Sequence, residues 1–274
     1  MKFQCFVFYI SLMTTTIVMF YSWKKLALFK ETPHVKFWYM ELKLQMRKLD
    51  ERCKHLMVKE KLHVLPKNFL YFPERRLLWC QTYNTGSSLW QQVVTYFDLI
   101  GSHGSVTNNL THQRHVRIKD MAMLERALSK KPVVFAVVQH PFTRLVAAFQ
   151  DVRTWGNQTF DDFLLLVLQE ARSFKTDEHN RMDFLLKPFY RMCSLCSMDF
   201  TLIAKFENFD SDRAKILELA GFHVDMDTQL SNKDDNSCKV TREYFKNTPI
   251  SVKRELRKVY ALDFKLLNYD KFLF

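Results

Sequence analysis

One apolar run constrains the fold of this chain more than any other feature. Residues Val133 to Val138 read Val-Val-Phe-Ala-Val-Val, and a continuous run rich in β-branched residues is typical of a central parallel strand buried on both faces. Pro141 cannot continue the hydrogen-bonded ladder of a strand, and the apolar residues after it recur at helical spacing. The run therefore predicts a strand–turn–helix unit of an α/β protein.

Three polar residues, Gln139, His140 and Arg144, follow this strand at its carboxyl end. Open α/β sheets bind their ligands at that edge. Two alternatives stay open, because a histidine in such a turn is commonly without a ligand and an arginine in a first helical turn is commonly solvated.

A second unit of the same kind begins at Leu77. Residues 77–80 predict a short buried strand, a polar loop follows over residues 83–88, and apolar residues recur at helical spacing over residues 89–99. Such a turn directs backbone N–H groups and a helix dipole at one point, which suits a phosphate or a sulfate. An ordinary strand-to-helix turn is the alternative, since the loop has one glycine and lacks the P-loop spacing.

The charge of the chain limits its partners. The formal net charge is +12, which implies an anionic partner such as a nucleic acid, a membrane surface, an acidic glycan or a nucleotide. Residues 3–23 are nearly uncharged and long enough to cross a bilayer as a helix, so we expect no nucleic-acid partner. We predict an uncleaved signal anchor behind a cytoplasmic tail of residues 1–2, because neither a short apolar core nor a cleavage site is evident.

The orientation of this anchor rests on opposing signals. Three lysines directly after it favour a cytoplasmic domain under the positive-inside rule. Glycosylation sequons at Asn109 and Asn157, together with five cysteines beyond the anchor, favour an oxidising lumen. We therefore expect a type II membrane glycoprotein with a basic helical stem over residues 24–66 and a lumenal domain over residues 67–274.

Helices and strands alternate along the lumenal domain. We expect helices over residues 121–128, 159–173, 211–220 and 252–260, a strand over residues 200–206 and a surface loop over residues 101–117. Thr159 and Asp162 are spaced as a capping box. Cys193 and Cys196 predict a disulfide involving one or both of them, since a zinc site would need two more ligands at suitable spacing.

Together these stretches resemble the Golgi carbohydrate sulfotransferases, the group that contains the chondroitin and dermatan 4-O-sulfotransferases. Residues 80–90 are similar to the family's Cys-x-x-Pro-Lys-x-x-Cys-Thr-x-Trp loop, which grips the 5′-phosphosulfate of 3′-phosphoadenosine 5′-phosphosulfate (PAPS). Residues 137–149 resemble the segment Val-Arg-x-Pro-Phe-Glu-Arg-Leu-x-Ser-Ala-Tyr, which holds the 3′-phosphate. Residues 190–207 and 260–269 resemble the family's cysteine block and its closing Tyr-x-x-Asp-Phe-x-x-Phe-x-Tyr motif.

The resemblance implies the PAPS-dependent sulfotransferase fold, a P-loop-like parallel sheet flanked by helices and preceded by a transmembrane helix and a stem. It implies a single-pass Golgi membrane enzyme that uses PAPS, needs no metal and transfers a sulfuryl group to a hydroxyl of a glycan or proteoglycan. Asn84 takes the leaving-group position, and His140 is a candidate for deprotonating the acceptor. The residues assigned to the nucleotide are Tyr83, Asn84, Thr85, Gly86, Ser87, Ser88, Leu89, Gln139, His140, Pro141, Arg144 and Ala147.

The chain departs from the family pattern at positions that carry charge. Asn84 stands where the family has its loop lysine, Gln139 where it has the arginine for the 3′-phosphate, and Ala147 where it has a serine. Loss of such an electrostatic donor lowers a rate on the order of a hundred- to a thousandfold. Three hypotheses remain, namely an active enzyme, a catalytically degenerate paralogue that binds glycans or a partner, and an unrelated membrane-anchored α/β protein. The oligomeric state, whether homo- or hetero-oligomer, is left open.

Overall fold

The computed structural model describes residues 33–56, 64–83, 85, 90, 115–151, 158–171, 185–219 and 236–269. The chain divides into two compact units, Met1–Arg47 and Lys48–Phe274. The described part of the first unit is the start of helix α2 (Pro33–His55), which agrees with the helix expected within the stem. No helix in the described ranges is both long and apolar enough to cross a bilayer, and the predicted anchor over residues 3–23 lies outside them.

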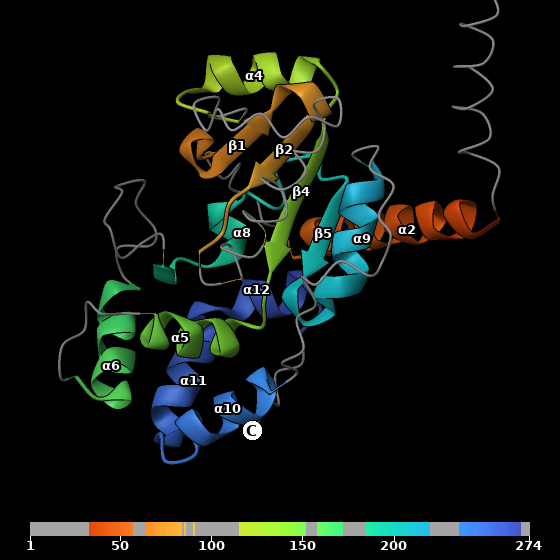
Figure 1. Ribbon diagram of the computed structural model, residues 1–274. Coiled ribbons are helices and arrows are strands. Elements are labelled where there is room, and N and C mark those ends of the chain that lie inside the picture. The colour runs from red at the N-terminus through yellow and green to blue at the C-terminus, as the bar shows by residue number, and fades with distance from the viewer. Residues whose placement is uncertain are drawn as a thin grey trace, which may run out of the picture. The chain divides into compact units, whose positions relative to one another are not determined.

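The larger unit is built on a five-stranded sheet with the order β3-β1-β2-β4-β5 (Figure 1). Its three parallel strands are β2 (Leu77–Cys80), β4 (Val133–Val138) and β5 (Leu202–Lys205). These confirm the two strands predicted before the polar turns and the third strand predicted within residues 200–206. The α/β class is therefore confirmed.

The predicted parallel sheet carries an antiparallel edge that the sequence did not predict. Strand β1 (Phe69–Phe72) pairs antiparallel with β2 and with β3 (Val116–Arg117). The connection from β1 to β2 contains only the 3₁₀ turn η2 (Pro73–Arg75) and one further residue, whereas a parallel crossover needs a dozen or more. Strand β3 also shortens the surface loop expected over residues 101–117, because its two residues pair with β1.

Most helices begin and end within a few residues of their predicted bounds. The capping box of Thr159 and Asp162 is confirmed at the start of α6. The helix expected over residues 89–99 lies outside the described residues except for Trp90, whose buried ring lies 6.0 Å from that of Phe135. The described helices after β3 are α4 (Met121–Ser129), α5 (Pro141–Gln150), α6 (Phe160–Glu170), α8 (Phe189–Met192), α9 (Phe209–Leu219), α10 (Ser237–Phe245), α11 (Ile250–Val259) and α12 (Ala261–Leu266).

A helical layer gathers beyond the carboxyl end of β4 (Figure 1). Helices α5, α6, α10, α11 and α12 share one hydrophobic core, in which Phe142, Phe163, Phe245 and Leu256 are fully buried. Aromatic rings fill much of it, and the rings of Phe142 and Phe245 stack at 4.9 Å. This core holds α5, and with it the turn after β4, in a fixed position against the sheet.

Candidate active site

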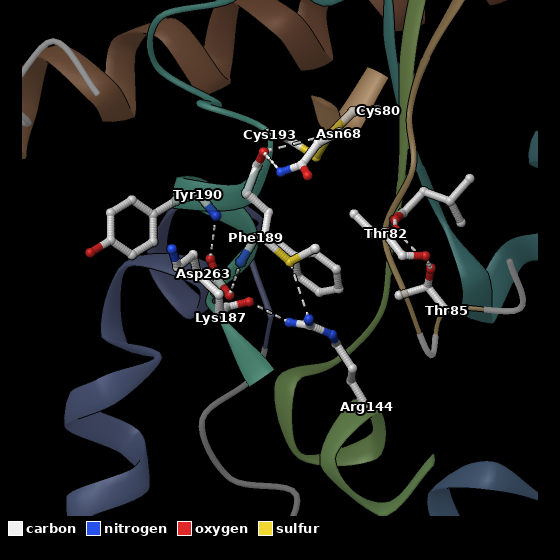
Figure 2. The surroundings of a disulfide bond; sticks show 12 residues. Asn68, Cys80, Thr82, Thr85, Arg144, Lys187, Phe189, Tyr190, Cys193 and Asp263 are labelled. Atoms are coloured by element: carbon white, nitrogen blue, oxygen red, sulfur yellow. Dashed lines mark hydrogen bonds between the residues drawn. A yellow bond between two sulfur atoms is a disulfide. The ribbon is translucent and has the colours of Figure 1, made fainter. Parts of the chain in front are cut away.

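Two threonines tie the end of β2 to the end of β4. The Thr82 hydroxyl donates to the carbonyl oxygen of Val137 at 2.6 Å, and the hydroxyls of Thr82 and Thr85 lie 2.7 Å apart. Thr82 gives its one hydroxyl proton to Val137, and the Thr85 hydroxyl lies within donating distance of both the Thr82 hydroxyl and the Thr82 carbonyl oxygen, the latter at 3.0 Å. Both side chains are fully buried and face each other in Figure 2. The start of the first predicted turn is therefore fastened to the strand that leads into the second. We call this arrangement the threonine clasp.

His140 lies directly before α5 as its N-cap, and both its backbone and its side chain are hydrogen-bonded. Its backbone N–H donates to Glu207 Oε1 at 2.7 Å, and its Nδ1 accepts the backbone N–H of Phe142 at 3.2 Å. A ring that accepts at Nδ1 is neutral and carries its proton on Nε2. The ring is almost fully buried, with ring-centroid distances of 5.3 Å to Phe264 and 5.5 Å to Tyr269. In this geometry His140 is a helix cap, and the lone pair of its Nδ1 is already engaged by the Phe142 N–H.

Gln139 lies between β4 and α5 with 3% of its surface exposed. Its Oε1 is buried and has no hydrogen-bond partner among the described residues. Such an unsatisfied buried acceptor costs about 1–3 kcal/mol and calls for an explanation, for example a ligand donor. Pro141 is the first residue of α5, and Ala147 lies partly buried two turns further along it.

The guanidinium of Arg144 joins the start of the turn after β2 to residues 187–192, and Figure 2 shows its contact with Lys187. It donates from Nε to the carbonyl oxygen of Tyr83 at 3.3 Å, from Nη1 to that of Lys187 at 2.8 Å, and from Nη2 to the sulfur of Met192 at 3.2 Å. It also lies 4.4 Å from the centroid of the Phe189 ring. Burial lowers the pKa of this arginine. These contacts make Arg144 a positioning residue that links the first predicted turn to α8.

Asp263 fixes the other side of the same segment. Its carboxylate accepts the backbone N–H groups of Phe189 and Tyr190, each at 2.8 Å, and so caps α8 (Figure 2). Burial raises the pKa of this carboxyl to about 6, while the two N–H groups and Arg144 act to lower it. The hydroxyl of Tyr260 donates to the carbonyl oxygen of Leu186 at 2.7 Å. Two side chains of the closing motif are therefore structural.

The sulfotransferase family model matches residues 67–270, a region that contains both strand-end turns. This chain belongs to the sulfotransferase family. It is a divergent member, 26% identical to mouse carbohydrate sulfotransferase 12 over 52% of this chain and 20% identical to mouse carbohydrate sulfotransferase 11 over 74%. Human carbohydrate sulfotransferase 8 is 22% identical over 72% of this chain. No solved structure gives a significant match.

This family member spans only part of those relatives. The aligned regions cover 41% of carbohydrate sulfotransferase 12, 67% of carbohydrate sulfotransferase 11 and 54% of carbohydrate sulfotransferase 8.

Most of the expected phosphosulfate loop lies outside the described residues. Of residues 83–89, the structure describes Tyr83 and Thr85 and leaves out Asn84, Gly86, Ser87, Ser88 and Leu89. The sequons at Asn109 and Asn157 also lie outside. In the described ranges no group of three or more His, Cys, Asp or Glu side chains is placed to hold a metal ion. The roles assigned to these residues and the independence from metal stay predictions.

Two disulfides confirm the prediction made from Cys193 and Cys196, and both cysteines take part. Cys193 pairs with Cys80 and Cys196 with Cys53. Cys80 is the last residue of β2, so its bond fixes the strand directly before the threonine clasp to the end of α8 (Figure 2). Asn68 strengthens the same junction, because its side chain donates to the carbonyl oxygen of Met192 at 2.8 Å.

Sequence reasoning missed a polar cluster at the end of β5. Glu207 accepts the His140 N–H through one oxygen and the Tyr269 hydroxyl, at 3.1 Å, through the other. Burial, and then the carboxylate, raise the pKa of Tyr269. Lys205 lies 4.2 Å from the centroid of the Tyr269 ring and donates to the carbonyl oxygen of Asn268 at 3.2 Å, and burial lowers its pKa. The position of Glu207 directly after the strand predicted over residues 200–206 was the available signal, because open α/β sheets bind ligands at the ends of their strands.

Proposed function

We propose that this protein is a membrane-anchored carbohydrate sulfotransferase of the Golgi lumen. It takes the sulfuryl group of a nucleotide 5′-phosphosulfate, by resemblance PAPS, and transfers it to a hydroxyl of a glycan or proteoglycan. The threonine clasp is the observation that carries the proposal, because it holds the turn after β2 against the end of β4. Two turns held together at the carboxyl edge of a parallel sheet suit one anionic ligand.

The proposed roles follow from where charge changes during transfer. The bond from sulfur to the bridging phosphate oxygen breaks, a bond to the acceptor oxygen forms, and the acceptor proton leaves. The protein mainly orients the reactants and stabilises the growing charge on the leaving phosphate. Residues 83–89 surround the phosphosulfate with Asn84 at the bridging oxygen, and residues 139–147 hold the nucleoside.

A degenerate paralogue is the second candidate, and two observations favour it. Gln139 and Asn84 carry no charge where the family places cations, and Arg144 already serves Tyr83, Lys187 and Met192. Such a protein would keep the fold and bind a glycan or a partner enzyme without transferring sulfate.

A transfer assay separates these candidates. The full chain, purified in a mild detergent because an anchor is predicted, is incubated with radiolabelled PAPS and a panel of desulfated glycans, and adenosine nucleotide binding is measured in parallel. Label on a glycan supports the enzyme. Nucleotide binding without transfer supports the degenerate paralogue, whereas failure of every adenosine 5′-nucleotide to bind at millimolar concentration rejects the proposed site.

A charge-restoring double variant tests the placement of the two turns. Asn84→Lys with Gln139→Arg is expected to strengthen binding of adenosine 3′,5′-bisphosphate by about tenfold to a thousandfold, since each added hydrogen bond to a charged group contributes roughly 1.5–3 kcal/mol. The control is Asn236→Lys with Gln169→Arg, which adds the same charge at two exposed positions. Equal affinities for the two double variants would show that the turns are wrongly placed.

A further inference from the structure

Gln139, the first of residues 139–147 that are proposed to hold the nucleotide, has a neutral side chain with one unsatisfied acceptor oxygen. Gln139 is 97% buried, and its Oε1 accepts no hydrogen bond from the described residues. A hydroxyl group would satisfy this oxygen by donating to it, whereas a phosphate dianion has only acceptor oxygens to present. If the Gln139 amide were rotated by half a turn, Nε2 would take the place of Oε1. The side chain would then offer a donor at this position but still no positive charge for a phosphate. Ala147 adds no hydroxyl donor.

The charges around Gln139 also disfavour a second phosphate. Glu207 places a carboxylate oxygen 2.7 Å from the backbone nitrogen of the next residue, His140. The guanidinium of Arg144 is engaged with the carbonyl oxygens of Tyr83 and Lys187, and the ammonium of Lys205 with that of Asn268. With Arg144 and Lys205 engaged in this way, a phosphate buried beside Gln139 would lose its hydration and gain no compensating ion pair from either of them.

From this arrangement we infer that the nucleotide site takes adenosine nucleotides with a free 3′-hydroxyl at least as well as those with a 3′-phosphate. The inference rests on the proposed function, which places the ribose beside residues 139–147. The inference also concerns the sulfuryl donor, which then needs no 3′-phosphate. Adenosine 5′-phosphosulfate is therefore a substrate as good as PAPS. In that reaction the bond between sulfur and the phosphate oxygen breaks, a bond between sulfur and the acceptor oxygen forms, AMP leaves, and the acceptor proton passes to solvent.

Calorimetric titration of the full chain with AMP and with adenosine 3′,5′-bisphosphate tests the inference. Both titrations use about 0.15 M salt, which screens the attraction between the extra charge of the bisphosphate and a basic chain. We expect AMP to bind as tightly as the bisphosphate or more tightly. Gln139→Arg should shift the ratio of the two dissociation constants by about tenfold to a hundredfold toward the bisphosphate. The matched control Gln169→Arg, at an exposed position of α6, should leave the ratio unchanged.

Each outcome bears on a different statement. A bisphosphate that binds wild type threefold or more tightly than AMP overturns the inference and leaves the proposed nucleotide site intact. Failure of both ligands to bind at millimolar concentration rejects the proposed site itself. A ratio that Gln139→Arg shifts by less than threefold removes Gln139 as the determinant. If that variant does not fold, Ala147→Ser serves in its place, with an expected shift of about fivefold toward the bisphosphate and the same threefold criterion.

Discussion

Removal of the Cys53–Cys196 disulfide should lower the free energy of unfolding by about 3.6 kcal/mol, less than its sequence separation suggests. Its two cysteines are 143 residues apart, and the Cys80–Cys193 bond lies inside that span with a separation of 113 residues. While the inner bond is intact, the outer bond closes only the remaining 30 residues, the difference between 143 and 113. Loop-closure entropy gives about 3.6 kcal/mol for such a loop, against about 5 kcal/mol for the full span.

The same reasoning predicts that the two disulfides are not additive. Removal of the inner pair alone should cost about 3.4 kcal/mol, and removal of both should cost about 8.4 kcal/mol. The double removal therefore exceeds the sum of the single removals by about 1.4 kcal/mol, because either bond shortens the loop that the other one closes.

Urea unfolding of the full chain, followed by tryptophan fluorescence, measures these differences in cysteine-to-serine pairs. Cys238→Ser is the control, since Cys238 is unpaired and should change the free energy of unfolding by less than about 1 kcal/mol. Strict additivity, or a cost of 5 kcal/mol or more for the outer pair alone, would refute the nested arrangement.

The remaining predictions concern three buried polar contacts. Arg144→Met should lower the free energy of unfolding by about 3–5 kcal/mol, and Arg144→Lys by less because one ammonium can still reach a carbonyl, as urea unfolding will show. Thr82→Val leaves the Val137 carbonyl without its donor and should cost about 1–3 kcal/mol, and equal stability of variant and wild type would contradict the threonine clasp. For Asp263, the folded pKa of about 6 lies above its unfolded value of 3.8. The folded state therefore binds the proton more tightly, and this carboxyl contributes more stability as the pH falls from about 7 to about 4. The advantage of wild type over Asp263→Asn should grow by roughly 2.4 kcal/mol over that range, and thermal melts at several pH values check the sign.

Local sequence signals predicted the parts of the fold that depend on neighbours in the chain. The bounds of β4 matched because a run of apolar, largely β-branched residues lies between Pro132 and a polar turn. The capping box at Thr159 depends on contacts three residues apart. Strand β1 was missed because its four apolar residues carry no period of their own, and its antiparallel partner is decided by the short turn that follows.

The candidate site could be predicted only in its position. The carboxyl ends of β2 and β4 were identified from the strand–turn–helix pattern, and the threonine clasp joins them. The partners of the polar side chains were not predictable, because Glu207 meets His140 across 67 residues and Asp263 meets Phe189 across 74. Arg144 was assigned to the nucleotide, whereas its described contacts are to Tyr83, Lys187 and Met192.

The amino-acid sequence by itself determined the α/β class, the strand–turn–helix units, and that Cys193, Cys196 or both take part in a disulfide. These follow from residue type and local spacing, which act over a few residues. Only the tertiary structure decided which cysteines pair, which acceptors hold Arg144 and that Gln139 Oε1 is buried with no partner among the described residues. Such properties depend on the distance between segments far apart in the chain, and packing alone sets that distance.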